Sequence, residues 1–165
     1  MSFKVLFLCT GNYYRSRFAE ILFNARALQA PIDFRATSRG VAIELGVGNI
    51  GPISSPALKR LKHLNIQDNS ISRFPQQVQD EDFQNADLII ALDETEHRGM
   101  IQRRYPNWVN RIEYWHIADI WAVAPEEALS AIEKNVQDLI VRLKTTVSST
   151  GCRTPARLWG PVPWW

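Results

Sequence analysis

Short apolar runs alternate with segments of helical periodicity along most of the chain, and this alternation is the feature that most constrains the fold. We expect strands over residues 3–8, 32–37, 86–92 and 112–115, and helices over 18–28, 56–64, 94–104 and 125–144. Strands that are separated by helices favour βαβ units, in which helices cover both faces of a parallel sheet. The sequence therefore predicts an α/β fold with three layers.

Composition limits the chain to one ordinary globular domain. It has 165 residues, of which 45% are hydrophobic and 22% charged, so it can bury a sizeable core and is not of the disordered class. The 19 Lys and Arg residues nearly balance 17 Asp and Glu, for a formal charge of +2, and the basic residues form no stripe. We expect no nucleic-acid partner.

Cysteine usage and hydropathy bear on compartment and cofactors. Two cysteines cannot build a disulfide framework, and no Cys/His spacing resembles a zinc site, so we expect a reducing compartment, no metal and no cofactor. The apolar run over residues 5–9 is shorter than the about 7–15 apolar residues of an export signal, and no run approaches the roughly 20 of a membrane span. We expect a cytoplasmic protein with no membrane partner.

The character of the chain changes near residue 147. A segment with three prolines and Trp159, Trp164 and Trp165 follows, and it shows no periodicity. We therefore expect a domain over 1–147 and an irregular tail over 148–165. Two interpretations of this tail remain: a functional segment and an extension appended to the domain.

The stretch over residues 8–16, Leu-Cys-Thr-Gly-Asn-Tyr-Tyr-Arg-Ser, carries the chemistry. It joins a buried strand to the N-terminus of a helix, where unpaired backbone N–H groups and the helix dipole favour an anion such as phosphate. Gly11 offers a permissive backbone, and Asn12 is one of the few residue types that tolerate a left-handed conformation. This loop predicts a phosphate cradle.

Cys9 at the start of the cradle is the candidate nucleophile. The helix dipole and Arg15 both stabilise its thiolate, and the planar guanidinium of Arg15 can grip two oxygens of one phosphoryl group. Ser16 can donate a hydrogen bond to the sulfur. A cysteine that ends a strand is usually only a small buried side chain, and an arginine in a first helical turn usually lies on the surface. The combination in this strand-loop-helix context favours catalysis.

The loop resembles the active site of the low-molecular-weight protein tyrosine phosphatases, whose motif is Cys, five residues, Arg, then Ser or Thr. Ser38-Arg39-Gly40 is similar to the family's Ser-Ala-Gly turn, residues 87–93 resemble its strand that ends in Met-Asp, and the last helix resembles its closing helix. The resemblance covers about residues 3–145. It implies a four-stranded parallel sheet flanked by helices, the phosphotyrosine phosphatase I-like fold, and a catalytic domain over 1–147.

The resemblance also implies the roles of individual residues. Cys9 forms a phosphocysteine and Arg15 binds the phosphoryl oxygens, while an aspartate late in the chain protonates the leaving phenolate. Asp93 resembles a supporting residue beside the loop. The other residues of the loop are implied to bind phosphate: Thr10, Gly11, Asn12, Tyr13, Tyr14 and Ser16. Ser38 and Trp121, outside the loop, are further supporting residues.

Asp119 is the candidate general acid. It follows the fourth expected strand and so lies at the carboxyl edge of the sheet, where Cys9 ends the first strand. One carboxyl can protonate the leaving oxygen and then activate water. A solvated loop carboxylate is the alternative. His116 is positioned to tune Asp119, but a surface role is the simpler hypothesis.

The sequence departs from the family pattern around these residues. Ile120 replaces the proline that follows the family's acid. Trp121 takes the place of the aromatic residues with which the family lines the site at this point. Tyr14 stands where many members carry a second cysteine, so we expect no disulfide lock on Cys9, with Cys152 as a weak substitute. Arg17 replaces a proline at the helix start, and the bulky Tyr13 narrows the mouth or stacks on an aromatic substrate.

The predicted function is hydrolysis of a phosphotyrosine protein or a small aryl phosphate, with inorganic phosphate as product, by a monomer or weak dimer. A thioredoxin-coupled arsenate reductase is one alternative, although it needs further cysteines. A phosphate or phosphopeptide binder without catalysis is the other. Residues 46–51 match the dinucleotide-binding glycine pattern, but the prolines at 52 and 56 stand where its helix belongs, so we expect a surface loop.

Overall fold

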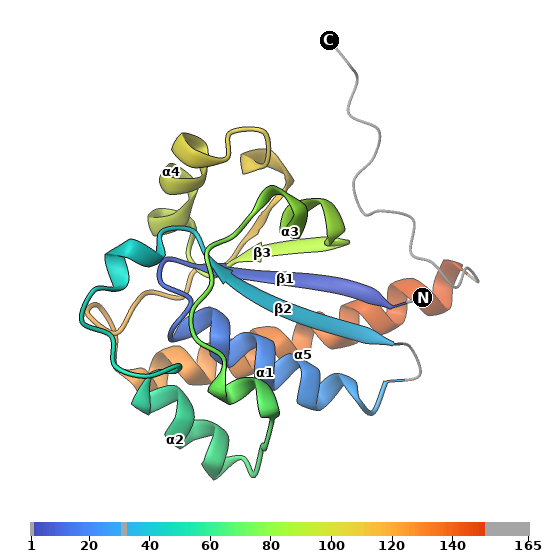
Figure 1. The fold of residues 1–165 in the computed structure, drawn as a ribbon. Coiled ribbons are helices and arrows are strands. Elements are labelled where there is room, and N and C mark those ends of the chain that lie inside the picture. The colour runs from blue at the N-terminus through green and yellow to red at the C-terminus, as the bar shows by residue number, and fades with distance from the viewer. Residues whose placement is uncertain (1, 31–32, 151–165) are drawn as a thin grey trace.

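The computed structural model describes residues 2–30 and 33–150 (Figure 1). Its strands are β1 (Phe3–Cys9), β2 (Phe34–Gly40), β3 (Leu88–Ala91) and β4 (Glu113–Tyr114). Its α-helices are α1 (Arg15–Ala27), α2 (Ser55–His63), α3 (Asp80–Asn85), α4 (Glu94–Arg104) and α5 (Pro125–Thr150). Short 3₁₀ helices cover Ile43–Gly46, Asn69–Ser72 and Val109–Arg111.

The four strands form one parallel sheet in the order β2-β1-β3-β4. Cys9 lies opposite Gly40 of β2, and Leu8 lies opposite Ala91 of β3. Since the strands run in the same direction, their carboxyl ends meet at one edge of the sheet. The predicted α/β class and four-stranded parallel sheet are confirmed, and Cys9 stands at that edge.

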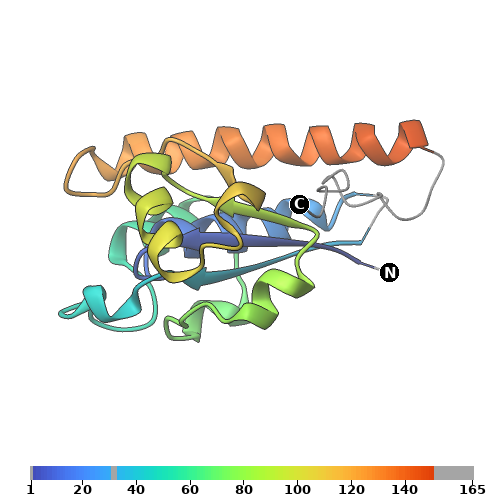
Figure 2. The same ribbon diagram turned by 90° about the horizontal axis from the view of Figure 1, so that it is seen from above.

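Helices cover both faces of the sheet (Figure 2). One core joins the sheet to α1, α2 and α5, and a second joins the opposite face to α3 and α4. Both faces of the central strand β1 are therefore buried, which explains why it reads as a continuous apolar run rather than as an alternating one.

The structure differs from the sequence prediction mainly at element boundaries. β4 has only two residues, although Trp115 and Ile117 continue to donate backbone hydrogen bonds to β3 and the residue after it. Helix α3 was not predicted because Phe83 is its only buried residue, so it has no apolar period. Its signal is the acidic first turn together with Asp82, which accepts a hydrogen bond from the Gln79 backbone.

Helix α5 begins at Pro125 as predicted and buries one apolar face against the sheet. It continues to Thr150, three residues beyond the domain boundary expected at 147. The rest of the expected tail, including Cys152, lies outside the described residues. Over 2–30 and 33–150, no helix combines the length and apolar character that crossing a membrane requires.

Phe7 provides a test of the core at the centre of the sheet. Its side chain is fully buried, and its ring centroid lies 5.9 Å from that of Phe23 and 5.7 Å from that of Trp115. We expect Phe7→Ala to lower the free energy of unfolding by about 3–5 kcal/mol, because it leaves a cavity. Val141→Ala on the exposed face of α5 should change it by less than about 0.5 kcal/mol. Urea denaturation of both variants measures the difference, and equal losses would contradict this account of the core.

Candidate active site

The loop between β1 and α1 presents unpaired backbone donors. Within the part of the chain that the structure describes, no backbone N–H of residues 11–14 donates a hydrogen bond to another group. The first bond of α1 runs from the Phe18 N–H to the Tyr14 carbonyl, so the preceding amides of the helix are also unpaired. Such a set of donors at a helix N-terminus suits a tetrahedral oxyanion.

The fully buried side chain of Asn12 holds this loop in shape. Asn12 has a φ of 51°, in the left-handed region that asparagine tolerates. Its amide nitrogen donates to Ser16 Oγ at 3.0 Å and to Ser38 Oγ at 2.9 Å. Its amide oxygen accepts from Arg73 Nη1 and from the Gln76 backbone, both at 3.1 Å. All four hydrogen-bonding positions of the side chain are therefore filled.

The Cys9 sulfur lies next to the hydroxyl of Ser16, with 2.9 Å between Sγ and Oγ. Because Ser16 Oγ already accepts a hydrogen bond from Asn12, its own proton is free to point at the sulfur. The contact is therefore suited to a thiolate at Cys9, which accepts a hydrogen bond as an anion and again as a leaving group.

The guanidinium of Arg15 is 2% exposed and is held by two carboxylates. Its Nη1 donates to the Ile117 carbonyl at 3.0 Å, while Nη2 donates to Glu96 Oε1 at 3.0 Å and to Asp119 Oδ2 at 3.1 Å. Burial alone would lower the pKa of Arg15, but the negative charges of Cys9, Glu96 and Asp119 outweigh burial and raise it. Arg15 is therefore a fixed positive charge beside the loop.

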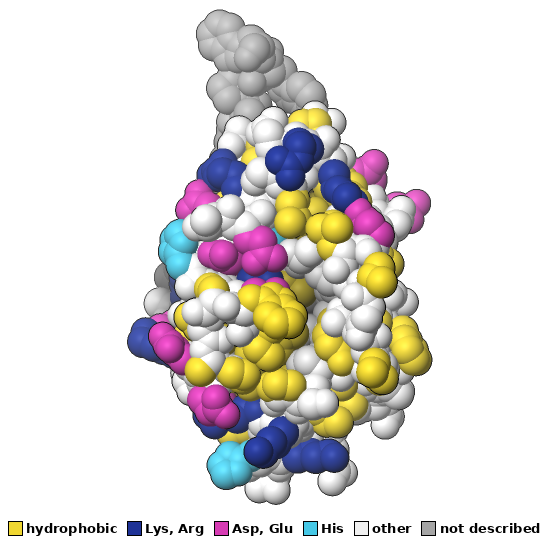
Figure 3. All heavy atoms as spheres, turned by 90° about the vertical axis from the view of Figure 1, so that its left-hand side faces the viewer, with side chains coloured by type: hydrophobic (Ala, Val, Ile, Leu, Met, Phe, Trp, Pro, Cys, Tyr) yellow, Lys and Arg dark blue, Asp and Glu magenta, His cyan; other side chains and the backbone are white. Residues whose placement is uncertain are grey.

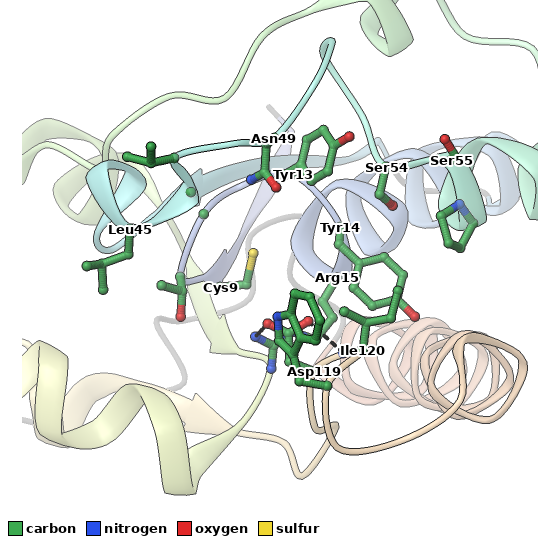
Figure 4. Close-up of a pocket in the computed structure, with 16 residues that line it drawn as sticks. Cys9, Tyr13, Tyr14, Arg15, Leu45, Asn49, Ser54, Ser55, Asp119 and Ile120 are labelled. Carbon is green, nitrogen blue, oxygen red and sulfur yellow. Dashed lines mark hydrogen bonds and ion pairs between the residues drawn. The ribbon is translucent and has the colours of Figure 1, made fainter.

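Cys9, Arg15 and Asp119 line one pocket of about 490 Å³ (Figure 4). Its walls include Leu45 and Val47 on one side and Ile120 and Trp121 on the other. Asp119 is one-third exposed, and its Oδ1 accepts a hydrogen bond from the following backbone N–H. A thiol, a guanidinium and a carboxyl thus share one cavity that opens to solvent.

A family model described as low molecular weight phosphotyrosine protein phosphatase matches residues 4–149. The chain belongs to this family. The match includes every element of the sheet and all the residues that line the pocket. No curated protein matches the sequence.

Several solved structures share the fold of this chain. The low molecular weight protein tyrosine phosphatase SP-PTP from Streptococcus pyogenes is 26% identical, with 86% of this chain and 93% of that chain covered and a TM-score of 0.71. The corresponding enzyme from T. tengcongensis is 27% identical, with coverages of 85% and 99% and a TM-score of 0.70. The YwlE arginine phosphatase from Geobacillus stearothermophilus is 24% identical, with coverages of 90% and 94% and a TM-score of 0.64.

A glycine at the end of β2 permits the close approach of the phosphatase loop. A Cβ at Gly40 would lie 2.8 Å from the Thr10 carbonyl oxygen and 2.5 Å from Ile43 Cγ2, so no larger residue fits. Gly11, for which we expected a special backbone role, does not have a positive φ, and a Cβ there would meet nothing closer than Asn49 Nδ2 at 3.7 Å. The left-handed turn of the loop is made by Asn12 instead.

The structure brings most of the predicted site residues together. Ser38 contacts Asn12 beneath the loop, and Trp121 is 93% exposed at the pocket mouth. The Tyr13 hydroxyl donates to the Ile50 carbonyl at 2.8 Å, so this side chain braces the loop over residues 46–51. Thr10 turns its hydroxyl toward Glu96. Gly11 and Tyr14 also line the pocket.

Asp93 and His116 are not brought into the pocket. The Asp93 side chain makes no hydrogen bond or ion pair with any described residue, and only its backbone contacts His97 and His116. Glu96, one helical turn further along the chain, is the α4 side chain that binds Arg15. His116 is 73% exposed and its Nε2 lies 3.9 Å from Glu94, so it does not reach Asp119.

A buried relay that sequence reasoning missed supports Arg15 from α4. The Asp93 backbone N–H donates to His97 Nδ1, so the ring proton lies on Nε2, 3.2 Å from Thr10 Oγ1. Thr10 in turn donates to Glu96, which binds Arg15. Burial by itself raises the pKa of Glu96, but the hydrogen bonds from His97 and Thr10 and the charge of Arg15 lower it to about 2. A glutamate in a first helical turn is common, so the sequence held no distinctive signal for this role.

A second buried network supports the loop from the β2 side. Glu20 accepts hydrogen bonds from Arg17, Ser38 and Arg73 through the same carboxylate oxygen. Burial lowers the pKa of Arg17, while the charge of Glu20 opposes this shift. The position of Glu20 on the apolar face of α1 was a sequence signal that this carboxylate has a buried partner. Nothing in the sequence indicated Arg73, which lies in a distant loop.

The described residues contain no group of three or more His, Cys, Asp or Glu side chains arranged to hold a metal ion. The positive charge beside the loop is supplied by Arg15.

Glu96 gives a pH-dependent test of this site. Its folded-state pKa of about 2 lies below the value of 4.5 for a free glutamate, so its ionised form stabilises the fold above about pH 4.5, and this contribution is lost as the pH falls toward 2. We expect Glu96→Gln to lower the free energy of unfolding by on the order of 2 kcal/mol at pH 7. The difference from wild type should narrow by pH 3.

Urea denaturation between pH 7 and pH 3 measures this difference. Glu94→Gln is the control, because it removes an exposed ion pair with Arg98 in the same helix and should cost less than about 0.5 kcal/mol at pH 7. A gap between wild type and Glu96→Gln that stays constant over the whole pH range would contradict the coupling of Glu96 to Arg15.

Proposed function

We propose that the protein hydrolyses aryl phosphate monoesters, including phosphotyrosine in polypeptides, through a phosphocysteine intermediate. One observation carries this proposal: the Cys9 sulfur lies 2.9 Å from the Ser16 hydroxyl oxygen in a pocket, beside unpaired backbone amides and Arg15. This arrangement suits attack by a thiolate on a bound phosphoryl group whose charge is met by fixed donors.

The reaction proceeds in two displacements. Cys9 Sγ attacks phosphorus, the bond from phosphorus to the aryl oxygen breaks, and Asp119 gives its proton to the departing oxygen. Water then attacks the phosphocysteine, its proton passes to the Asp119 carboxylate, and the bond from phosphorus to sulfur breaks. Inorganic phosphate leaves and the thiolate is restored. Arg15 and the amides of the loop hold the phosphoryl oxygens through both steps.

The walls of the pocket favour an aromatic leaving group. Tyr13, Tyr14, Ile120 and Trp121 line it, and Figure 3 shows hydrophobic side chains gathered on this face of the molecule. Asp119 is the only carboxylate among the lining residues, and Arg15 already neutralises it. A planar apolar ring is better matched to these walls than the charged guanidinium of a phosphoarginine, the substrate type named for the YwlE relative.

Two features of the site argue against the alternative functions, an arsenate reductase and a non-catalytic phosphate binder. Reductases that share the loop relay electrons through further cysteines, and Cys9 is the only cysteine in the part of the chain that the structure describes. A binder without catalysis has no use for a carboxyl in the cavity, yet Asp119 lines the same pocket as Cys9.

Cys9→Ser tests the nucleophile. We expect this variant to lose hydrolysis of p-nitrophenyl phosphate by at least about 10³-fold, because a serine hydroxyl in this site is a far poorer nucleophile than a thiolate. Binding of inorganic phosphate, measured by calorimetry, should stay within about tenfold of wild type. Retained turnover in Cys9→Ser would refute the phosphocysteine pathway. A wild-type protein that binds phosphate without turnover would favour the binder.

Trp121→Ala tests the substrate class. Loss of the aromatic wall should raise KM for a phosphotyrosine peptide about threefold to tenfold and leave phosphate binding unchanged. Ile50→Ala is the matched control, because Ile50 is exposed on the same face but does not line the pocket, and it should change KM less than about twofold. Faster hydrolysis of a phosphoarginine peptide than of the phosphotyrosine peptide by the wild type would contradict the proposed aryl preference.

A further inference from the structure

The phenol hydroxyl of Tyr14 is buried without a hydrogen-bond partner among the described residues. Tyr14 is only 6% exposed, and its side chain contributes to the wall of the catalytic pocket. An unpaired buried hydroxyl costs free energy in the resting protein. Buried polar groups of this kind call for a functional explanation, because nearly all others in folded proteins are paired.

Asp119, which lines the same pocket as Tyr14, is the candidate partner of this hydroxyl. Burial and then the negative charge of Asp119 raise the pKa of the phenol to about 12, with Arg15 opposing this shift and Glu126 adding to it. The hydroxyl is therefore protonated at neutral pH and serves as a donor. Figure 4 shows the Tyr14 ring extending toward Ile120, the residue that follows Asp119.

Asp119 is paired with Arg15 in the resting structure, at the group that we expect to bind the phosphoryl oxygens. Its Oδ2 accepts from Arg15 Nη2 at 3.1 Å, and the same nitrogen binds Glu96. A phosphoryl dianion that binds to Arg15 competes with Asp119 for this nitrogen, because both are anions and a guanidinium has a fixed number of donors. Glu96 is held by Thr10 and His97 as well, so Asp119 is the carboxylate more easily displaced.

We propose that the Tyr14 hydroxyl donates a hydrogen bond to the Asp119 carboxyl once substrate occupies Arg15, and so positions the general acid. This inference rests on the proposed function. Tyr14 is a positioning residue, and its proton stays on the phenol throughout.

The hydrogen bond from Tyr14 helps most when proton transfer from Asp119 is most needed. In the first displacement Asp119 gives its proton to the leaving oxygen and becomes a carboxylate, which a donated hydrogen bond stabilises. A poor leaving group depends strongly on this proton, whereas an acidic phenol departs with little help. The contribution of Tyr14 therefore grows with the basicity of the leaving group.

Tyr14→Phe removes the hydroxyl and keeps the ring. We expect kcat for phenyl phosphate to fall about tenfold, which corresponds to about 1.4 kcal/mol, and kcat for p-nitrophenyl phosphate to fall less than about threefold. In the wild type the hydrogen bond from Tyr14 favours the ionised form of the Asp119 carboxyl. Without it the carboxyl keeps its proton to higher pH, so the basic limb of the pH profile of kcat should move to higher pH. The thermal midpoint of the free protein should stay the same or rise, because the lost hydroxyl has no partner in the resting state.

Two further variants separate positioning from a structural effect. Tyr114→Phe removes a phenol hydroxyl that is satisfied, since it donates to the Val109 carbonyl at 2.9 Å away from the pocket, and should lower the thermal midpoint while leaving both kcat values unchanged. In an Asp119→Asn background, Tyr14→Phe should have no further effect on kcat for phenyl phosphate, because the two residues act as one unit.

The inference is overturned if Tyr14→Phe leaves kcat for phenyl phosphate and the pH profile unchanged, if its effects add to those of Asp119→Asn, or if it lowers the thermal midpoint as Tyr114→Phe does. Its failure is distinguishable from failure of the proposed function. The latter shows as turnover that survives Cys9→Ser, whatever the behaviour of Tyr14.

Discussion

The saturated hydrogen bonding of the Asn12 side chain is the constraint on which the site depends. Asn12 adopts a left-handed backbone, which few residue types other than glycine tolerate as well as asparagine does, and its four hydrogen bonds join the loop to Ser16, Ser38, Arg73 and the Gln76 backbone. The hydrogen bond from Asn12 to Ser16 Oγ also leaves the serine proton free to point at the Cys9 sulfur, 2.9 Å away. One buried amide thus determines both the shape of the anion cradle and the polarity around its thiol.

Arg15 connects this cradle to the opposite side of the pocket. Its carboxylate partners differ in how firmly they are held, since Glu96 belongs to a buried relay through Thr10 and His97, while Asp119 lies in a partly exposed turn. The positive charge of Arg15 is therefore balanced by one firmly held carboxylate and one loosely held carboxylate. In the mechanism that we propose, the loosely held carboxylate is the one that a phosphoryl group displaces.

The sequence predicted the parallel sheet, the placement of Cys9 and Arg15 at its carboxyl edge and the left-handed Asn12, because these follow from local patterns: apolar runs, a strand-loop-helix junction and a residue type that tolerates positive φ. It did not predict Glu96, Arg73 or the brace from Tyr13 to Ile50, because these depend on how distant loops meet. The supporting role that the resemblance implies for Asp93 stays a prediction, since its backbone N–H donates to His97 while its side chain bonds to no described residue. Its position at a strand end was evident, but the contact of Glu96 with the arginine was not.

The wide spacing along the chain of the groups that hold Asn12 has a consequence for how this protein acquires its site during folding. Arg73 and Gln76 lie 61 and 64 residues from Asn12, so the loop cannot reach its final conformation until the chain has closed that distance and ordered β2 and the connection to α3. Contacts this remote in sequence form late, because the entropy of loop closure is lost before they contribute. A partly folded chain can therefore contain helices and the central strand without an anion cradle, and recovery of turnover on refolding reports the completed topology rather than the appearance of secondary structure.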